Sequence, residues 1–340
     1  MKQHIVILRL SSKGDVAIAA PLVKAYAIAN PEIQFTMVSQ SLLGALFEGV
    51  PNLHFCRINY YRDNWPMWRA VRLAKEIKKM NPAPTKIIDL QDSERTKLIR
   101  WLVAPKEGVS VIWKSRFSRE ALSRKDDKIL QQVSTTQRRY EKVFSDAGLH
   151  DLEFAKQRVE KRKPVLQKSR NIGIAPFARH QSKQWPLEYM EEVVACLSKE
   201  PDTKIFLFGG CKNEASLLDK WENKYDNTES IAGKHNMKEE LEYVKNLDVM
   251  ISMDSANLHF ASFVKTPVIS IWGGTHLYAG FYGWGQDPDL ALQIDLGCRP
   301  CSVNGEKDCF RDKNRYQCLT DITPDMLLNK IGSYYNELSN

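Results

Sequence analysis

Hydrophobic and polar positions follow two alternating patterns along the chain. Short apolar runs are each followed by a stretch in which apolar side chains recur every three or four residues. The runs have the length of buried strands, and the stretches have the period of helices that pack on a sheet. In the first half we expect strands at 5–8, 35–38, 86–90 and 109–112, and helices at 17–29, 68–80, 94–103 and 136–147.

The same pattern resumes after residues 156–170, a basic segment containing Pro164 that we interpret as an interdomain linker. Pro324, with Thr323 before it as a cap, opens a last helix that runs to about residue 338. Between them we expect strands at 171–175, 204–208, 249–252 and 268–271, and helices at 187–198, 214–224, 238–246 and 256–264.

This alternation predicts an α/β fold with parallel sheets covered by helices. A length of 340 residues suits two domains, so we expect two Rossmann-like domains facing each other across a cleft. The predicted boundaries are 1–164, 165–322 and a C-terminal helix at 323–340. Because ligands bind beyond the carboxyl ends of parallel strands, the cleft is the expected site of chemistry.

Composition excludes several classes of protein. The chain is 43% hydrophobic and 26% charged, as ordinary globular proteins are, and no apolar run approaches the roughly 18 residues that span a bilayer. The seven cysteines are odd in number and thinly spread except near the C-terminus, which favours a reducing compartment over a disulfide scaffold. We therefore expect a cytoplasmic protein.

Charge is divided unevenly between the two halves. Residues 1–164 carry 30 Lys and Arg against 17 Asp and Glu, a net charge of +13, whereas the remainder carries 19 against 24, a net charge of −5. This asymmetry favours an anionic partner for the first half, which could be a nucleic acid, a phosphorylated acceptor or an acidic membrane surface. A solubilising basic surface is the alternative. Because no known nucleic-acid-binding motif is present, we expect no nucleic-acid partner.

The first predicted strand leads into a turn whose side chains could take part in a reaction. Ser11, Ser12, Gly14 and Asp15 stand between this strand and the next helix, where Asp15 would lie at the mouth of the cleft. Asp15 could equally cap its own helix. The G-x-G-x-x-G pattern of nicotinamide-dinucleotide sites does not follow this strand, which argues against that cofactor.

Two turns in the second half are suited to a diphosphate. The strand ending at 175 delivers Arg179 and Lys183 to one loop, where lysine offers a point charge and arginine two parallel donors. An ordinary basic surface loop is the alternative. The strand ending near 252 leads to Asp254, Ser255 and Ala256 at the start of a helix, whose backbone amides can hold phosphate oxygens.

His259, one turn into that helix, faces the cleft or packs in the core. The following strand ends in Gly273 and Gly274, which permit close approach of the backbone to a ligand.

Taken together, these motifs resemble glycosyltransferase family 9, the ADP-heptose:lipopolysaccharide heptosyltransferases. The resemblance rests on the 11–15 turn, the 88–91 strand end, the Lys183 and Trp185 loop, the 254–259 segment and the 266–275 strand and turn, which occur in the family's order along nearly the whole chain. It implies a GT-B architecture, with an acceptor domain first, a nucleotide-sugar domain second and a final helix returning toward the first domain. It also implies inverting transfer from an ADP-sugar with no essential metal or other cofactor.

The resemblance also implies roles for individual residues. Asp15 corresponds to the catalytic base, and Ser12, Gly14 and Gln91 lie in the turns expected to bind the acceptor. The donor-binding residues it implies are Arg179, Lys183, Glu214, His235, Met237, Asp254, Ser255, Ala256 and His259. Glu214 corresponds to a ribose-binding acid, and residues 234–237 fall where the family holds adenine. Two alternatives stay open: a GT-B transferase or epimerase that uses a UDP- or GDP-sugar, and a non-enzymatic protein that binds nucleic acid through the basic half.

Three positions depart from the family's pattern. Ala256 and Asp92 stand where glycine is usual, and Lys13 stands where an apolar residue is usual. Ala256 is expected to tighten the phosphate-binding loop. Since Asp92 and Lys13 lie in the acceptor half, they bear on the choice of acceptor.

The family's acceptor is an anionic glycolipid, which suits the basic first half. Arg62, Arg116 and Arg119 are candidate acceptor-binding cations, and they are interleaved with aromatic residues such as Trp68 and Trp113. Such mixtures bind anionic interfaces, so we expect peripheral contact with the inner face of the cytoplasmic membrane. Alternatively, the aromatic residues lie in the core and only the cations are exposed.

Cys298, Cys301, Cys309 and Cys318 are spaced as C-x₂-C-x₇-C-x₈-C. The first pair has the spacing of two ligands of one zinc ion, whereas the second pair is not spaced in that way. The four cysteines could hold a structural zinc, form a facultative disulfide or remain free thiols.

Overall fold

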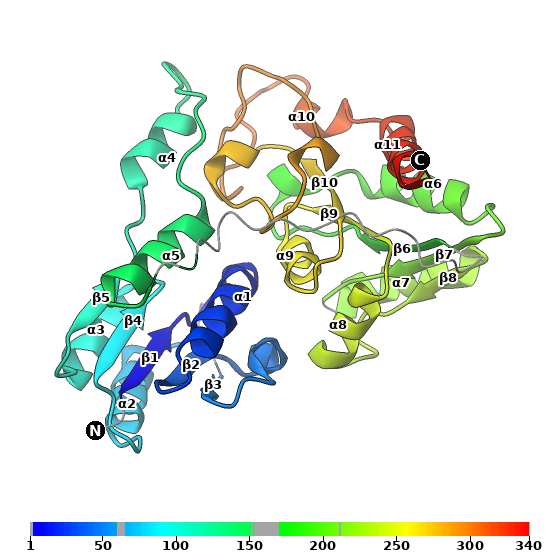
Figure 1. Ribbon diagram of the computed structural model, residues 1–340. Helices are drawn as coiled ribbons and strands as arrows, with labels where there is room; N and C mark the ends of the chain where they lie inside the picture. Colours follow the sequence, from blue (N-terminus) through cyan, green and yellow to red (C-terminus); the bar gives the residue numbers. More distant parts are fainter. Residues whose placement is uncertain (1–2, 60–64, 151, 153–169, 211, 340) are drawn as a thin grey trace. The chain divides into compact units, whose positions relative to one another are not determined.

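The computed structural model describes residues 3–59, 65–150, 152, 170–210 and 212–339. Within them the chain forms two compact α/β units (Figure 1). Each unit is built on its own parallel sheet, as the alternation of apolar runs and helical stretches predicts. The expected α/β class is therefore confirmed.

The sheet of the first unit has the strand order β3-β2-β1-β4-β5. Its strands are β1 (His4–Leu8), β2 (Gln34–Gln40), β3 (Leu53–Ile58), β4 (Lys86–Asp89) and β5 (Val109–Val111). All five residues of β1 are buried because helices cover both faces of the central strand. These helices are α1 (Lys13–Ala29), α2 (Met67–Lys78), α3 (Glu94–Val103) and α5 (Thr136–Asp146).

The helices of the first unit form two groups. Apolar side chains of α2 and α3 share a core cluster with Val6 and Leu8 of β1. Helices α1 and α5 contact each other, and Tyr26 stacks on Phe144 with ring centroids 4.4 Å apart. Helix α1 begins at Lys13, four residues earlier than expected, which places Asp15 in its first turn.

The second sheet has the order β11-β10-β9-β6-β7-β8. Its strands are β6 (Arg170–Ala175), β7 (Thr203–Leu207), β8 (Thr228–Ser230), β9 (Val249–Met253), β10 (Val268–Trp272) and β11 (Ala291–Gln293). Alternate residues of β9 face opposite sides: Ile251 joins the core cluster of α6 (Leu187–Leu197), whereas Met250 joins that of α9 (Ala256–Phe263). The remaining helices are α7 (Lys212–Lys224), α8 (Met237–Lys245), α10 (Gln317–Thr320) and α11 (Pro324–Ser339).

The structure adds elements that the apolar pattern did not predict. Strands β3, β8 and β11 lie at sheet edges, where a strand is covered less and lacks a long apolar run. Helix α4 (Arg116–Leu122) is also new and buries only Ala121 and Leu122.

The division between the units differs from the predicted boundary at residue 164. Residues 115–135 were expected in the first domain but group with the second unit. The backbone amide of Val133 donates to the Tyr278 carbonyl at 3.0 Å, and the Arg119 guanidinium lies 4.4 Å from the ring centroid of Phe281. These contacts are remote in sequence, so the local pattern could not reveal them. Residues 156–169 of the predicted linker lie outside the described residues.

The last helix also belongs to the second unit. Helix α11 packs on α6, and Leu327, Ile331 and Tyr334 are buried in the cluster that contains α6. The Tyr334 hydroxyl donates to the Asp248 carbonyl at 3.0 Å. The expected separate helix at 323–340 is therefore part of the second unit's core.

Candidate active site: an acidic turn and a cationic turn

The turn after β1 carries the acidic group of the first unit. Asp15 is the third residue of α1, and one carboxylate oxygen accepts hydrogen bonds from the Ser12 hydroxyl at 2.9 Å and the Ser12 amide at 3.4 Å. The same oxygen forms an ion pair with Arg9, the first residue after β1. About a quarter of the Asp15 side chain, 23%, remains exposed. Asp15 thus caps its helix and still reaches the surface.

The surroundings of Asp15 favour its charged form. Burial by itself would raise the pKa of the Asp15 carboxyl, but the charge of Arg9 and the hydrogen bonds from Ser12 outweigh it and lower this pKa below its ordinary value. The carboxylate is therefore ionised at neutral pH, as a proton acceptor must be. The sequence reasoning missed the pairing of Arg9 with Asp15, although both residues belong to the same turn.

Gln91 supports this turn from the neighbouring strand. Its side-chain oxygen accepts from the backbone amides of Leu10 at 2.7 Å and Ser11 at 3.3 Å, and its amide donates to the Ser11 hydroxyl at 3.3 Å. In this structure Gln91 holds the turn in place. Its predicted contact with the acceptor remains a prediction.

Asp92 has the backbone conformation that explains the family's usual glycine. Its φ is 48°, in the left-handed region that aspartate tolerates better than most residues. Its side chain pairs with Arg100 at 3.3 Å. Arg100 also reaches the buried Asp89 at 2.9 Å, so Asp92 takes part in an ion-pair cluster at this turn.

The cationic turn of the second unit is assembled at the carboxyl ends of three adjacent strands, β6, β9 and β10. The Lys183 ammonium lies 3.0 Å from one Asp254 carboxylate oxygen, and the Thr275 hydroxyl donates to that same oxygen at 2.8 Å. Both charged side chains are largely buried, with 14% of Lys183 and 7% of Asp254 exposed. Lys183 and Asp254 were predicted here, whereas Thr275 was seen only as part of a glycine turn.

Glycines allow the turn of Lys183 to approach β10. The Gly274 amide donates to the Ser182 carbonyl at 2.7 Å. A Cβ atom on Gly273 would lie 2.6 Å from that carbonyl oxygen, closer than atoms can pack. Gly273 and Gly274 were expected to let the backbone approach a ligand; here they let β10 approach the loop of Lys183, and the contact with a ligand remains a prediction.

Helix α9 presents its N-terminus beside this cluster. Ser255 is the N-cap residue, its side chain forms no cap hydrogen bond among the described residues, and the first turn contains no acidic residue. Its backbone amides are thus available for an anion. Ala256 is the first helical residue, and His259 is buried, with 6% exposed. Of the two positions expected for His259, burial favours the core.

Glu214 and the 234–237 segment flank a cavity at the ends of β7 and β8. The Glu214 carboxylate accepts from the Gly210 amide at 2.5 Å. Gly210, Gly233 and Lys234 line a cavity of about 600 Å³, a size typical of ligand sites. Lys234, one of these lining residues, is held by an ion pair with Glu222 at 2.7 Å.

His235 and Met237 are only half-buried. The His235 ring packs on Tyr243 with centroids 4.9 Å apart, and Met237 is the first residue of α8 after the Asn236 cap. Arg179 is exposed and takes part in none of the ion pairs among the described residues. The predicted ligand contacts of these three residues remain predictions.

The predicted acceptor cations fall in different places. Arg116 is exposed on α4 and Arg119 packs on Phe281, so both belong to the second unit and not to the acceptor half where they were expected. Arg62 lies outside the described residues. Ser12 is exposed and Gly14 half-buried at the start of α1, and their acceptor role remains a prediction.

The aromatic residues divide between the two alternatives considered for them. Trp65 is buried, whereas Trp68 is 59% and Trp113 is 67% exposed. Arg69 lies over the Trp68 ring at 5.4 Å from the centroid. Among the described residues no helix is both long and apolar enough to cross a membrane.

Comparison with known proteins identifies the class. The sequence pattern of glycosyltransferase family 9 (heptosyltransferase) matches residues 71–307. The chain belongs to this family, and the protein is a glycosyltransferase.

Individual relatives agree with the family. The chain is 25% identical over 287 residues to the lipopolysaccharide core heptosyltransferase OpsX of Haemophilus influenzae, which covers 78% of each chain. The fold of this chain matches that of Escherichia coli ADP-heptose lipopolysaccharide heptosyltransferase II with a TM-score of 0.68 at 13% identity, and the match covers 99% of this chain and 100% of that one. Escherichia coli WaaC, solved with ADP-2-deoxy-2-fluoro heptose, matches with a TM-score of 0.67 at 15% identity, over 97% and 99%. The expected GT-B class is thus confirmed.

Proposed function

We propose that this protein transfers heptose from ADP-heptose to a hydroxyl of a lipopolysaccharide core acceptor, with inversion at the anomeric carbon. The observation that carries the proposal is the cluster of Lys183, Asp254 and Thr275 beside the N-terminus of α9. A cation and free backbone amides at the carboxyl ends of neighbouring strands suit a pyrophosphate. The relatives' names supply the sugar and the acceptor class.

The proposal assigns different chemistry to the two units. The first unit holds the acceptor, and Asp15 removes the proton from its attacking hydroxyl. General-base help of this kind contributes about 10²- to 10⁴-fold to the rate. The ionised state of Asp15 and its partial exposure support this role.

The second unit holds the donor and stabilises the leaving ADP. Negative charge grows on the diphosphate as the glycosidic bond breaks, and Lys183 with the tip of α9 would stabilise it. When a phosphate binds, the Lys183 ammonium would interact with it and with the Asp254 carboxylate at the same time. The hydroxyl of Thr275 donates to the Asp254 oxygen that faces Lys183 and so keeps this carboxylate in place. Arg179 is placed on the same loop as a further cation. Transfer by these groups requires no metal ion.

The acceptor's lipid would bring the first unit to a membrane surface. The exposed Trp68 and its neighbour Arg69 form the combination of aromatic and cationic groups that suits an anionic interface. Binding to vesicles with anionic lipids, but not to neutral vesicles, would support this contact. Trp68→Ala should weaken it, whereas Trp221→Phe, a change in the second unit's core, should not.

A transfer assay tests the function directly. ADP-heptose and a heptose-free lipopolysaccharide core should yield heptosylated product and ADP, whereas UDP- and GDP-sugars should not. In parallel, ADP should raise the melting temperature more than UDP or GDP does, because a ligand that binds only the folded state stabilises it. Equal stabilisation by all three nucleotides, or transfer from a UDP-sugar alone, would contradict the proposal.

A further inference from the structure

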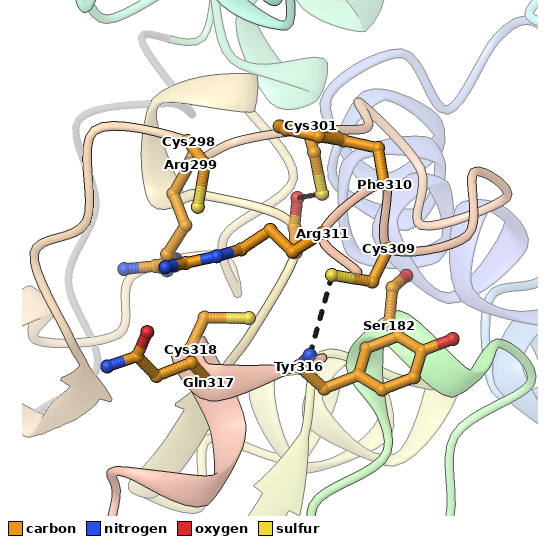
Figure 2. Close-up of a pocket in the computed structure, with 11 residues that line it drawn as sticks. Ser182, Cys298, Arg299, Cys301, Cys309, Phe310, Arg311, Tyr316, Gln317 and Cys318 are labelled. Atoms are coloured by element: carbon orange, nitrogen blue, oxygen red, sulfur yellow. Dashed lines mark hydrogen bonds between the residues drawn. The ribbon is translucent and has the colours of Figure 1, made fainter. Parts of the chain in front are cut away.

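Four cysteines surround one small cavity in the second unit. Cys298, Cys301, Cys309 and Cys318 all line it, and Figure 2 shows their sulfur atoms arranged around its interior. The cavity measures about 10 Å³, which is room for one occupant the size of a water oxygen. Cys318 is buried and the other three cysteines are half-buried. Four soft ligands around a one-atom space are the donor set that zinc and iron take up.

A buried cation lies against this cavity. Arg299 is 3% exposed and also lines the cavity. Its guanidinium donates only to oxygen atoms that carry no net charge: the backbone carbonyls of Trp272, Gly273, Thr275 and Ile294 and the side-chain amide of Gln293. It takes part in none of the ion pairs found among the described residues.

A buried guanidinium usually has an anionic partner, because removing its charge from water is costly. A divalent ion with four thiolates carries a net charge of −2, and it would supply that partner. A metal centre would thus add a negative charge beside Arg299 to that of the Asp295 carboxylate, which also acts on its guanidinium.

Two hydrogen bonds involving sulfur are found at the cavity among the described residues, and in one of them the Cys301 thiol donates to the Gly274 carbonyl at 3.5 Å. The Tyr316 amide donates to the Cys309 sulfur at 3.4 Å, a contact drawn in Figure 2. Such N–H to sulfur bonds orient metal-bound ligands. In their present rotamers no three His, Cys, Asp or Glu side chains of the described residues are close enough together to coordinate one ion. Binding would therefore turn the sulfurs inward about their χ1 torsions.

We propose that Cys298, Cys301, Cys309 and Cys318 bind one thiophilic metal ion, zinc or iron, as a tetrahedral structural centre. Four thiols lose four protons as four metal–sulfur bonds form, and no electron is transferred. The metal ion would cross-link residues 298–318 through the four cysteine side chains.

This segment in turn packs on the cationic turn. The Ser182 hydroxyl donates to the Gly305 carbonyl at 2.7 Å, and the Cys301 amide donates to the Gly274 carbonyl at 3.0 Å. Gly305 has a φ of +87°, and a Cβ there would lie 2.3 Å from Cδ of Lys183. If the donor role of Lys183 in the proposed function holds, the metal centre is also what fixes the wall of the donor site.

Elemental analysis of the purified full-length protein is the first test. We expect about one equivalent of zinc or iron per chain, and the analysis itself distinguishes the two metals. Cys298→Ser and Cys318→Ser should lose most of it. Cys196→Ser, which removes an exposed cysteine of α6 outside the cavity, is the matched control and should keep it.

Cobalt substitution provides a second readout that does not depend on activity. Metal-stripped protein should take up one equivalent of Co²⁺ and develop the thiolate-to-cobalt charge-transfer and visible bands of a tetrahedral thiolate site. Metal-free wild-type protein that takes up no cobalt, or equal metal content in Cys298→Ser and wild type, would overturn the proposal. So would a disulfide among these cysteines in protein purified without oxidant, detected by mass spectrometry as the loss of two hydrogens. A transfer assay that failed while metal was bound would contradict only the proposed function.

Discussion

The turn after β1 in the first unit and the turns after β6 and β9 in the second occupy equivalent places in two parallel sheets, yet they carry opposite chemistry. In the first unit the helix that follows is capped by an acid from its own first turn, Asp15. In the second unit the first turn of α9 has no acid, and Lys183 stands beside it.

The comparison shows how one fold can provide two kinds of site. A helix N-terminus attracts negative charge wherever it occurs. When the chain supplies that charge, the carboxylate is held ionised and positioned, and it can accept a proton. When the chain leaves the amides free and adds a cation, the site can accept a phosphate from a ligand. The choice depends on a few residues in the turn and not on the topology of the sheet.

The largest effect should follow from Asp15→Asn. The amide cannot take a proton from the acceptor, so kcat for heptose transfer should fall by about 10²- to 10⁴-fold. Affinity for ADP, measured by calorimetry, should stay within a factor of two, because the change lies in the other unit. Asp146→Asn, which removes an exposed acid from α5 of the same unit, is the control and should leave kcat unchanged. Near-normal turnover of Asp15→Asn would refute the assignment of the base.

Lys183→Ala should affect the cationic turn of the second unit and weaken donor binding. Losing a charge-assisted contact to the pyrophosphate, worth about 1.5–3 kcal/mol, should weaken ADP binding by about 10- to 100-fold. Lys204→Ala removes an equally charged lysine that pairs with Glu229 on β7 and β8, and it should bind ADP normally. Equal affinities for ADP in Lys183→Ala and Lys204→Ala would show that the cationic turn does not bind the donor.

Thr275→Val should have a smaller effect in the same cluster. It removes the hydroxyl that donates to Asp254 while keeping the volume of the side chain, so ADP affinity should fall by about 2- to 10-fold. The half-buried Thr228 on β8 donates only to a local carbonyl, and Thr228→Val should leave the ADP affinity unchanged. A normal ADP affinity would show that Lys183 alone orients Asp254.

Arg9→Gln should change the pH profile more than the rate at neutral pH. Arg9 lowers the pKa of the Asp15 carboxyl, so kcat/KM of the wild type should hold until the pH falls below the ordinary range of an aspartate. Without that cation the pKa of Asp15 rises, and the loss of activity on acidification should begin at higher pH. Identical acid limbs for the two proteins would mean that this limb reports another group.

Local patterns along the chain were sufficient for the architecture. Central strands such as β1, β4, β6, β9 and β10 are buried on both faces, so their apolar runs stand out in the sequence. The edge strands β3, β8 and β11 have a neighbouring strand on one side only and gave no such signal, whereas the edge strand β5 was predicted from its short apolar run. The chemistry-bearing turns were found for a related reason: each follows a central strand whose end was predicted within a residue or two.

Contacts between remote segments were decided only in three dimensions. The sequence located Asp15, Lys183 and Asp254, but it did not show that Thr275, on another strand end, donates to Asp254. Even within the turn after β1, it did not show that Arg9 pairs with Asp15. It assigned residues 115–135 to the first half, whereas Arg119 and Val133 pack on the second unit. Periodicity along the chain records which face of an element is buried, because burial repeats with the element's own geometry. Which partner covers that face depends on how distant segments meet, and only the folded chain fixes that.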